Sequence, residues 1–428
     1  MVRGIRTARL LAVATASLLT GLTACAGTAK PPAPTSTTGA PASTPQEQTS
    51  AAPEQGGEKG EQRGEVARAL AGMSLEDKVG QLFMPVLPGT TADAKTIRKY
   101  RLGGVILFPD NIKTVEQVVA LTNGLQEAAG KVPMLVGTDQ ENGIVSRVGA
   151  LMTKFPGAKV IGDTGDTALA RKAAEATGAE LKSLGINLDF APVADVNINP
   201  RNPVIGVRAY GSDPAKVSRM VGAAVKGFAD AGVAATAKHF PGHGDTTTDS
   251  HTGLPVIKHT RAQWEKLDAP PFRAAIAAGV DAIMTAHIVM PALDPSGDPA
   301  TLSKPILTGI LRGKLGFKGV ISTDALNMEG VRTKYGDGEV AVRAVLAGAD
   351  LLLMPPSLDK AYTAVLGAVK SGRISAKRLD ESVTRLLELR RARGFLDRAP
   401  VASAEEANRV LRSAEHRKLA ARITRASR

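Results

Sequence analysis

A cluster of titratable side chains lies in residues 236–255, which read TAKHFPGHGDTTTDSHTGLP. Four of the six histidines of the chain fall within 21 positions in and just after this segment: His239, His243, His251 and His259. Lys238, Asp245 and Asp249 accompany them. Glycine, proline and threonine are typical of a loop, and a loop gains no packing energy from such residues. The cluster therefore predicts acid–base chemistry, because histidine is the side chain that ordinarily titrates near neutral pH.

Asp249 and His251 are the pair best suited to transfer a proton. They are two residues apart, so their side chains share a face of an extended segment, and a nearby carboxylate favours a protonated imidazole. Asp324 ends the apolar run in GVISTDALNM and is placed to act as a nucleophile or charge stabiliser for an electron-poor carbon. The structural alternative for Asp324 is an N-cap of the next helix.

Further polar residues are suited to hold a neutral ligand rich in hydroxyl groups: Asp139, Asn142, Arg147, Arg208, Lys238, His239 and His287. The sequence has no glycine-rich phosphate loop, so these donors and acceptors favour a sugar over a nucleotide. A metal-dependent hydrolase is an alternative, because His239, His243, His251 and Asp245 are possible ligands, but their spacing fits no zinc signature. We therefore predict neither a metal nor a cofactor.

Eight short apolar runs alternate with amphipathic segments after residue 66 and would position these side chains. The runs cover residues 80–87, 102–108, 133–139, 186–196, 233–239, 281–290, 319–328 and 350–355. Continuous apolar strands that are each followed by a helix indicate a parallel sheet buried on both faces. The pattern predicts an α/β fold, a (β/α)8 TIM-type barrel in a single catalytic domain, with an open α/β sheet as the alternative.

The polar residues fall where such a barrel carries its active site, at the carboxyl ends of the strands. Five predicted strands end in polar groups, at 138–142, 195–197, 238–239, 287 and 322–324. Several helices end at a glycine directly before the next strand, as a helix stop requires (Gly185, Gly232, Gly279 and Gly348). An opening helix at 66–79 is predicted to close the N-terminal mouth, and helices at 377–393 and 404–424 are predicted to pad or cover the barrel base.

The two ends of the chain carry different signals. Residues 1–24 hold three arginines followed by an uncharged run, which predicts a secretory signal peptide. The ending LTAC is similar to a bacterial lipoprotein signal that leaves Cys25 diacylated, and two acyl chains give stable membrane attachment. An ordinary secreted protein is the alternative. Residues 25–65, rich in Pro, Ser, Thr, Ala and Gly, are predicted to be a flexible tether, and residues 66–395 the catalytic domain.

The formal net charge of +13 is concentrated at the C-terminal end, where eleven Arg and Lys face four acidic residues after position 389. Residues 396–428 are predicted to be a basic helical extension, suited to touch anionic envelope polymers or lipid headgroups. Nucleic acid is not an expected partner, because the chain is predicted to be exported and only 3% of its residues are aromatic. We expect a monomer in an extracytoplasmic, membrane-anchored location.

Several motifs in a fixed order resemble the N-acetyl-β-glucosaminidases of glycoside hydrolase family 3. They are KHFPGHG followed by DSH, DQE at the third strand, NPVIGxR after the fourth and TD at the seventh. The resemblance, over about residues 66–395, implies a retaining mechanism in which Asp324 forms a glycosyl-enzyme and His251, paired with Asp249, acts as acid and then base. It also implies sugar contacts from Asp139, Arg208, Lys238 and His239. His243 is interpreted as structural.

The pattern also departs from that family at the third strand, where DQENGI replaces the usual DQEGGR, and at Ala325, where many relatives have a second aspartate.

The sequence predicts an exo-acting β-N-acetylhexosaminidase that removes terminal N-acetylglucosamine from peptidoglycan fragments. Phosphorolysis is an alternative, because a histidine, unlike a carboxylate, does not repel incoming phosphate. A surface lipoprotein that binds glycans without cleaving them is the other alternative.

Overall fold

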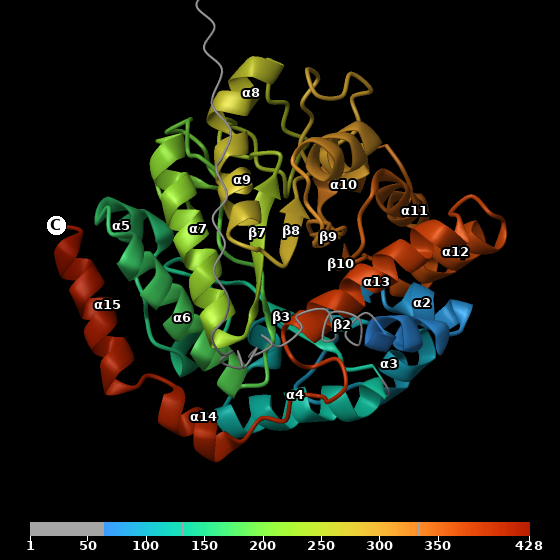
Figure 1. Ribbon diagram of the computed structural model, residues 1–428, viewed down its shortest axis with the longest axis horizontal. Helices are drawn as coiled ribbons and strands as arrows, with labels where there is room; N and C mark the ends of the chain where they lie inside the picture. Colours follow the sequence, from blue (N-terminus) through green and yellow to red (C-terminus); the bar gives the residue numbers. More distant parts are fainter. Residues whose placement is uncertain (1–63, 131, 333) are drawn as a thin grey trace, which may run out of the picture. The chain divides into compact units, whose positions relative to one another are not determined.

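The computed structural model describes residues 64–130, 132–332 and 334–428 (Figure 1). Within this part of the chain, no helix combines the length and the apolar character needed to cross a bilayer. The predicted signal peptide, Cys25 and almost all of the tether lie outside the described residues.

Eight short parallel strands form the centre of the domain, and each overlaps one of the eight apolar runs. They are β1 (Phe83–Met84), β2 (Gly104–Ile106), β3 (Leu135–Thr138), β6 (Leu188–Asp189), β7 (Ala234–Phe240), β8 (Ala282–Thr285), β9 (Val320–Ser322) and β10 (Leu352–Leu353). Six of them pair in the order β2-β3-β6-β7-β8-β9, and β1 pairs with β10. The two remaining strands, β4 (Gln140–Asn142) and β5 (Val145–Ser146), form an antiparallel hairpin directly after β3.

Two further contacts join the strand pair to the six-stranded sheet. A parallel bridge connects Ser322, the last residue of β9, with Leu351 before β10. On the other side, the Ile106 N–H of β2 donates a hydrogen bond of 3.1 Å to the carbonyl of Pro85 after β1. The predicted parallel α/β architecture is confirmed, whereas strand ladders do not run unbroken around all eight strands of the described chain.

Helices cover the outer face of the strands and follow the predicted amphipathic segments closely. They are α3 (Ala94–Tyr100), α4 (Val115–Ala129), α5 (Ala158–Asp163), α6 (Thr167–Ser183), α7 (Pro214–Ala231), α8 (Arg261–Leu267), α9 (Ala269–Ala277), the π-helix η5 (Pro305–Lys314), α10 (Glu329–Arg332), α11 (Asp337–Ala347) and α12 (Leu358–Lys370). Short 3₁₀ turns lie at η1 (Pro109–Asn111), η2 (Gly149–Leu151), η3 (Gly206–Arg208) and η4 (Ala300–Leu302).

Helix α7 shows how local sequence sets these boundaries. The Asp213 side chain accepts a hydrogen bond from the Lys216 N–H, and Pro214 occupies the first turn, where its missing N–H costs nothing. The helix stops at Gly232, which has a φ of +77° and is left-handed. Gly185, Gly279 and Gly348 also have positive φ, so the predicted helix stops are confirmed.

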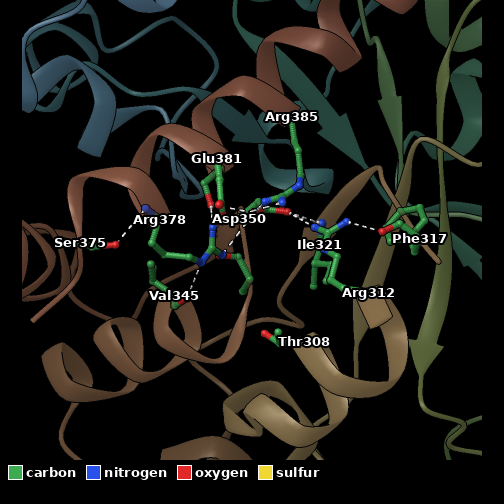
Figure 2. Close-up of polar contacts among 12 residues, drawn as sticks. Thr308, Arg312, Phe317, Ile321, Val345, Asp350, Ser375, Arg378, Glu381 and Arg385 are labelled. Atoms are coloured by element: carbon green, nitrogen blue, oxygen red, sulfur yellow. Dashed lines mark hydrogen bonds and ion pairs between the residues drawn. The ribbon is translucent and has the colours of Figure 1, made fainter. Parts of the chain in front are cut away.

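Helix α13 (Ala376–Ala392) lies against the amino ends of the strands, so the prediction of a base-covering helix at 377–393 is confirmed. Figure 2 shows Arg378 and Arg385 of this helix, with Arg312 of η5, converging on Asp350 at the start of the last strand segment. Asp350 is fully buried. One carboxylate therefore joins η5, the eighth strand and α13.

Arg390 of α13 is also fully buried, and it donates to the carbonyls of Pro133 at 2.6 Å and Gly103 at 2.7 Å. It ties α13 to the segments that lead into β2 and β3. Burial lowers the pKa of Arg390 to about 9.

The last two helices, α14 (Ala404–Val410) and α15 (Ala414–Ala426), pack on the outside of α4, α5 and α6 (Figure 1). The segment predicted as a helix at 404–424 therefore packs against the outer helices and does not cover the base of the strands. The physical reason is Glu180 of α6, which is fully buried and accepts hydrogen bonds from the Arg412 N–H at 3.0 Å and the His416 ring at 2.6 Å.

At the N-terminal end of the described chain, the predicted opening helix is divided into residues 64–71 and α2 (Leu75–Gly80), and α2 packs against α3, α12 and α13.

Candidate active site

A cavity of 460 Å³ opens at the carboxyl ends of the strands. Its lining contains the residues that the family resemblance assigned to catalysis and sugar contact: Asp139, Arg208, Lys238, His239, Asp249, His251 and Asp324. Asp139 directly follows β3, Lys238 and His239 lie near the end of β7, and Asp324 follows β9. The prediction that strand ends bring these side chains to one opening is therefore confirmed.

Four charged side chains form a closed network on one wall of the cavity. The Lys238 ammonium lies 2.5 Å from an oxygen of Asp139 and 2.7 Å from one of Glu141. Arg208 binds Glu141 through two hydrogen bonds of 2.7 and 2.8 Å. Bidentate guanidinium–carboxylate pairs fix both position and orientation.

Glu141 is the residue in this network that the sequence did not single out, although it stands in the DQE motif. Burial opposes its ionisation, but the charges of Lys238 and Arg208 outweigh that effect and lower the pKa of Glu141 to about 2. For Lys238, burial is likewise outweighed by Asp139 and Glu141, so its pKa is raised. Glu141 and Lys238 are therefore both charged at neutral pH, and a bound ligand meets donors and acceptors that are already oriented.

A second network is centred on Asp195, a fully buried carboxylate that follows β6. One oxygen lies 2.7 Å from the His239 Nδ1, and the other accepts a hydrogen bond of 2.7 Å from the His243 N–H. Burial opposes the charge of Asp195, but His239 and His243 together outweigh burial, so the pKa of Asp195 is lowered. Asp195 thus sets the orientation of the His239 ring, a contribution that the sequence did not reveal.

The Asp249–His251 pair is formed as predicted. The His251 Nδ1 lies 2.7 Å from Asp249 Oδ1, and the same oxygen accepts the His251 backbone N–H at 2.8 Å. The side chains are 60% exposed for His251 and 40% for Asp249, and they stand on a segment without helix or strand. Burial opposes the charge of Asp249, but the hydrogen bonds from His251 outweigh burial and lower the pKa of Asp249. The carboxylate binds the imidazole at Nδ1, which leaves Nε2 to exchange a proton.

Asp324 presents an ionised carboxylate to the cavity. Burial would raise its pKa, but the nearby His287 and His239 outweigh burial and lower the pKa. Its Oδ1 accepts the Ala325 N–H at 2.7 Å, whereas the next helix, α10, begins only at Glu329. The N-cap alternative for Asp324 is therefore wrong, and the carboxylate is available for chemistry.

Arg147 and Phe108 add a further wall to the cavity. The Arg147 guanidinium lies over the Phe108 ring at 5.3 Å, and its buried Nε has no hydrogen-bond partner among the described residues. Such a donor is suited to a ligand oxygen, in keeping with the sequence prediction for Arg147.

Other residues of the predicted set lie away from the cavity. Asn142 donates to Thr177 of α6, and His287 is fully buried and contacts Thr301 and the carbonyl of Ala325. His259 lies between Asp268 at 2.7 Å and Asp245 at 2.9 Å. Among the described residues, no group of three or more His, Cys, Asp or Glu is arranged to hold a metal ion, so the metal-dependent alternative has no support from this arrangement.

Comparison with known proteins gives concordant matches. The profile "Glycosyl hydrolase family 3 N terminal domain" matches residues 74–389. A β-hexosaminidase A of Pseudoalteromonas piscicida is 40% identical over 365 residues, which cover 78% of this chain and 60% of that protein. A β-hexosaminidase of Nitrosospira multiformis is 34% identical, over 70% of this chain and 89% of its own length.

Solved structures give the same picture. A glycoside hydrolase family 3 β-N-acetylglucosaminidase from Paenibacillus superimposes with a TM-score of 0.80 at 46% identity, covering 83% of this chain and 69% of that one. The chain thus spans about three fifths of the length of the Pseudoalteromonas relative and most of the length of the Nitrosospira relative.

Proposed function

Because the chain belongs to glycosyl hydrolase family 3, we propose that it is a retaining, exo-acting β-N-acetylglucosaminidase. The observation that carries this proposal is the cavity that holds an ionised Asp324, a carboxylate-bound imidazole at His251 and a wall of charged hydrogen-bonding groups. The relatives from Pseudoalteromonas and Paenibacillus bear names of the same activity. A terminal sugar fits a cavity of 460 Å³ better than an internal stretch of polymer does, which favours exo action.

The reaction proceeds in two displacements. In the first, an Asp324 oxygen bonds to the anomeric carbon while the glycosidic C–O bond breaks and His251 gives its proton to the leaving oxygen. In the second, His251 takes a proton from water as the water oxygen bonds to the anomeric carbon and the ester bond to Asp324 breaks. Asp249 stabilises the protonated imidazole, and the network of Asp139, Arg208, Lys238 and His239 holds the sugar hydroxyls.

A panel of p-nitrophenyl β-glycosides tests the activity. We expect cleavage of the N-acetylglucosaminide by the wild type, and a loss of roughly a thousandfold or more in Asp324→Ala. His251→Ala is expected to lose roughly a hundredfold or more. Asp110→Ala, which changes an exposed carboxylate outside the cavity, is the matched control and should retain wild-type activity.

The products distinguish the alternatives. Free N-acetylglucosamine in phosphate buffer supports hydrolysis, whereas N-acetylglucosamine 1-phosphate as the main product would identify a phosphorylase. Cleavage of glucosides alone would contradict the sugar assignment. Activity that is unchanged in Asp324→Ala would remove the catalytic assignment and favour a glycan-binding protein.

The fold is proposed to be a closed (β/α)8 barrel, residues 66–395, followed by the basic extension at 396–428. The hydrogen bond from Ile106 to Pro85 and the bridge between Ser322 and Leu351 support closure, because they join β1–β10 to both edges of the six-stranded sheet. Slow hydrogen exchange at the Ile106 amide, comparable with that of neighbouring β2 and β3 amides, would agree with closure.

The substrate and location are proposed from the sequence. An extracytoplasmic lipoprotein, anchored through an acylated Cys25, would meet N-acetylglucosamine at the ends of peptidoglycan fragments. Cys25→Ser is expected to shift the protein from the membrane to the soluble fraction of the cells that express it. If the variant partitions like the wild type, anchoring by Cys25 is wrong.

A further inference from the structure

His243 lies between the sugar cavity and the segment that carries the Asp249–His251 pair. Its side chain is 1% exposed and lines the cavity, and its Nε2 lies 2.9 Å from the Ser250 hydroxyl. Ser250 stands between the two members of the pair in the sequence. We propose that the His243–Ser250 hydrogen bond is a latch that holds the Asp249–His251 pair at the cavity, so that His243 and Ser250 are positioning residues for proton transfer.

The segment needs such a latch because little else fixes it. From residue 247 to residue 254 there is no helix or strand, and Ser250 is the one buried residue. The His251 side chain, at 60% exposed, gains no orientation from packing. A side chain that delivers a proton must stay within hydrogen-bond distance of its acceptor, so movement of its backbone lowers the rate of proton transfer. Ser250, the buried residue, is the point at which this segment can be held.

The floor beneath Ser250 is tightly packed. A Cβ atom on Gly330, next to the start of α10, would lie 2.8 Å from the Ser250 carbonyl and 2.6 Å from that of Gly253. The Glu329 N–H also faces the His251 carbonyl at 3.5 Å. These contacts with α10 limit movement of the backbone of residues 250–253 toward that helix. The hydrogen bond between Ser250 and His243 holds the segment through a side chain.

The partner of Ser250 is itself held rigidly. The His243 N–H donates to Asp195, the carboxylate that also binds the His239 ring. A Cβ atom on Gly244 would lie 1.6 Å from the Val196 carbonyl, so the backbone directly after His243 packs closely against that of Val196. A single buried network therefore runs from the proposed sugar ligand His239, through Asp195 and His243, to the proton-transfer pair.

The chemistry of the ring suits this task. Burial lowers the pKa of His243, so a neutral ring with one N–H faces the Ser250 hydroxyl, which can donate or accept. The buried Nδ1 of His243 has no partner among the described residues. A second N–H on a protonated ring would have no acceptor among those residues, so the surroundings favour the neutral form.

The latch predicts a pattern across substrates. Departure of a poor leaving group needs the proton from His251, whereas departure of dinitrophenolate does not. In Ser250→Ala, we expect kcat/KM for an N-acetylglucosamine disaccharide to fall roughly tenfold to a hundredfold, within the contribution of a general acid. For the 2,4-dinitrophenyl N-acetylglucosaminide, kcat/KM should stay within about threefold of the wild type, and kcat should rise when azide replaces water as the nucleophile. This inference rests on the proposed function.

Two further variants test whether the hydrogen bond is responsible. Ser250→Thr keeps the hydroxyl and should retain the wild-type dependence on the leaving group. In a double-mutant cycle, adding His243→Ala to Ser250→Ala should cost little more than the first substitution, because both remove one interaction. Thermal unfolding of each variant, and its kcat/KM on the dinitrophenyl substrate, show whether the cavity is intact.

Specific results would overturn the latch. An equal loss of Ser250→Ala on all leaving groups would indicate a general structural role, and no loss on the disaccharide would show that the hydrogen bond positions nothing. Ser250→Thr behaving like Ser250→Ala would show that the hydroxyl is not the cause. Failure of the wild type to cleave any N-acetylglucosaminide would instead reject the proposed function.

Discussion

Glu141→Gln removes the negative charge from the buried network that holds Lys238 and Arg208. The ordinary pKa of the carboxyl is 4.5 and its pKa in the folded protein is about 2, so the difference corresponds to about 3 kcal/mol of stability at pH 7. The amide keeps one oxygen acceptor but turns an NH2 group toward a cation, which adds to the loss. We therefore expect the variant to lose about 3 kcal/mol or more in free energy of unfolding.

The sign of the pH dependence follows from the lowered pKa. Glu141 contributes stability fully above pH 4.5, and that contribution is lost as the pH falls from 4.5 toward 2. The measurement is urea denaturation of the wild type and variant between pH 7 and pH 3. Their difference in free energy of unfolding should be largest at pH 7 and shrink at the acid end.

A matched control separates this network from a general charge effect. Glu127→Gln changes an exposed carboxylate on α4 and should alter stability by less than about 1 kcal/mol at every pH. A constant difference between wild type and Glu141→Gln from pH 7 to pH 3 would refute the reasoning, because it would show that Glu141 ionises in the folded state no more readily than in the unfolded chain.

Three more outcomes follow from buried carboxylates elsewhere. Asp350→Ala leaves the guanidiniums of Figure 2 without their common partner and should cost about 3 to 5 kcal/mol in urea denaturation. Asp380→Ala on α13 breaks a single, partly exposed pair with Lys78 and should cost about 1 kcal/mol or less. Glu180→Gln weakens the anchor of α15 at His416, so limited proteolysis should release the C-terminal helix faster than in the wild type, and an unchanged cleavage rate would contradict this anchoring role. Burial raises the pKa of Asp189 from 3.8 to about 8. The contribution of this carboxyl group to the free energy of unfolding is therefore fully present below pH 3.8 and is lost as the pH rises toward 8. Asp189→Asn should therefore gain stability relative to the wild type between pH 4 and pH 8, and a parallel pH dependence of the two melting temperatures would contradict it.

The strands could be predicted because a buried parallel strand leaves a continuous apolar run, bounded by turns, that a single sequence displays. The strand count also led to the prediction of a closed barrel, but no local pattern encodes closure itself, because closure depends on contacts between distant segments, such as that between Ile106 and Pro85. The position of α15 was missed for a related reason. Its amphipathic pattern shows that one face is buried but not against what, and its anchor Glu180 lies 236 residues before His416.

Asp139, Lys238, His239 and Asp324 could be placed together because they lie at or just after the ends of different strands of one sheet. Glu141 and Asp195 were missed because the sequence shows only that carboxylates are present, whereas their importance comes from pairing with Arg208 and His239. A usable signal exists in DQE: Asp139 and Glu141 are two positions apart in an extended segment, so both can reach one cation from the same face. Lys238 is that cation.

The charges of the cavity explain why Asp324 is suited to the proposed chemistry. Asp139 and Glu141 balance Lys238 and Arg208 within hydrogen-bond distance, so this wall presents hydrogen-bonding groups to the cavity without adding net charge. Asp324, by contrast, has no ion pair within the described residues and faces the cavity as a carboxylate. A glycosidic transition state gains positive charge at the anomeric carbon, and a fixed negative charge beside it stabilises the transition state more than the neutral substrate. The same argument predicts that a neutral nucleophile position, as in Asp324→Asn, binds the sugar nearly as well as the wild type but does not turn it over.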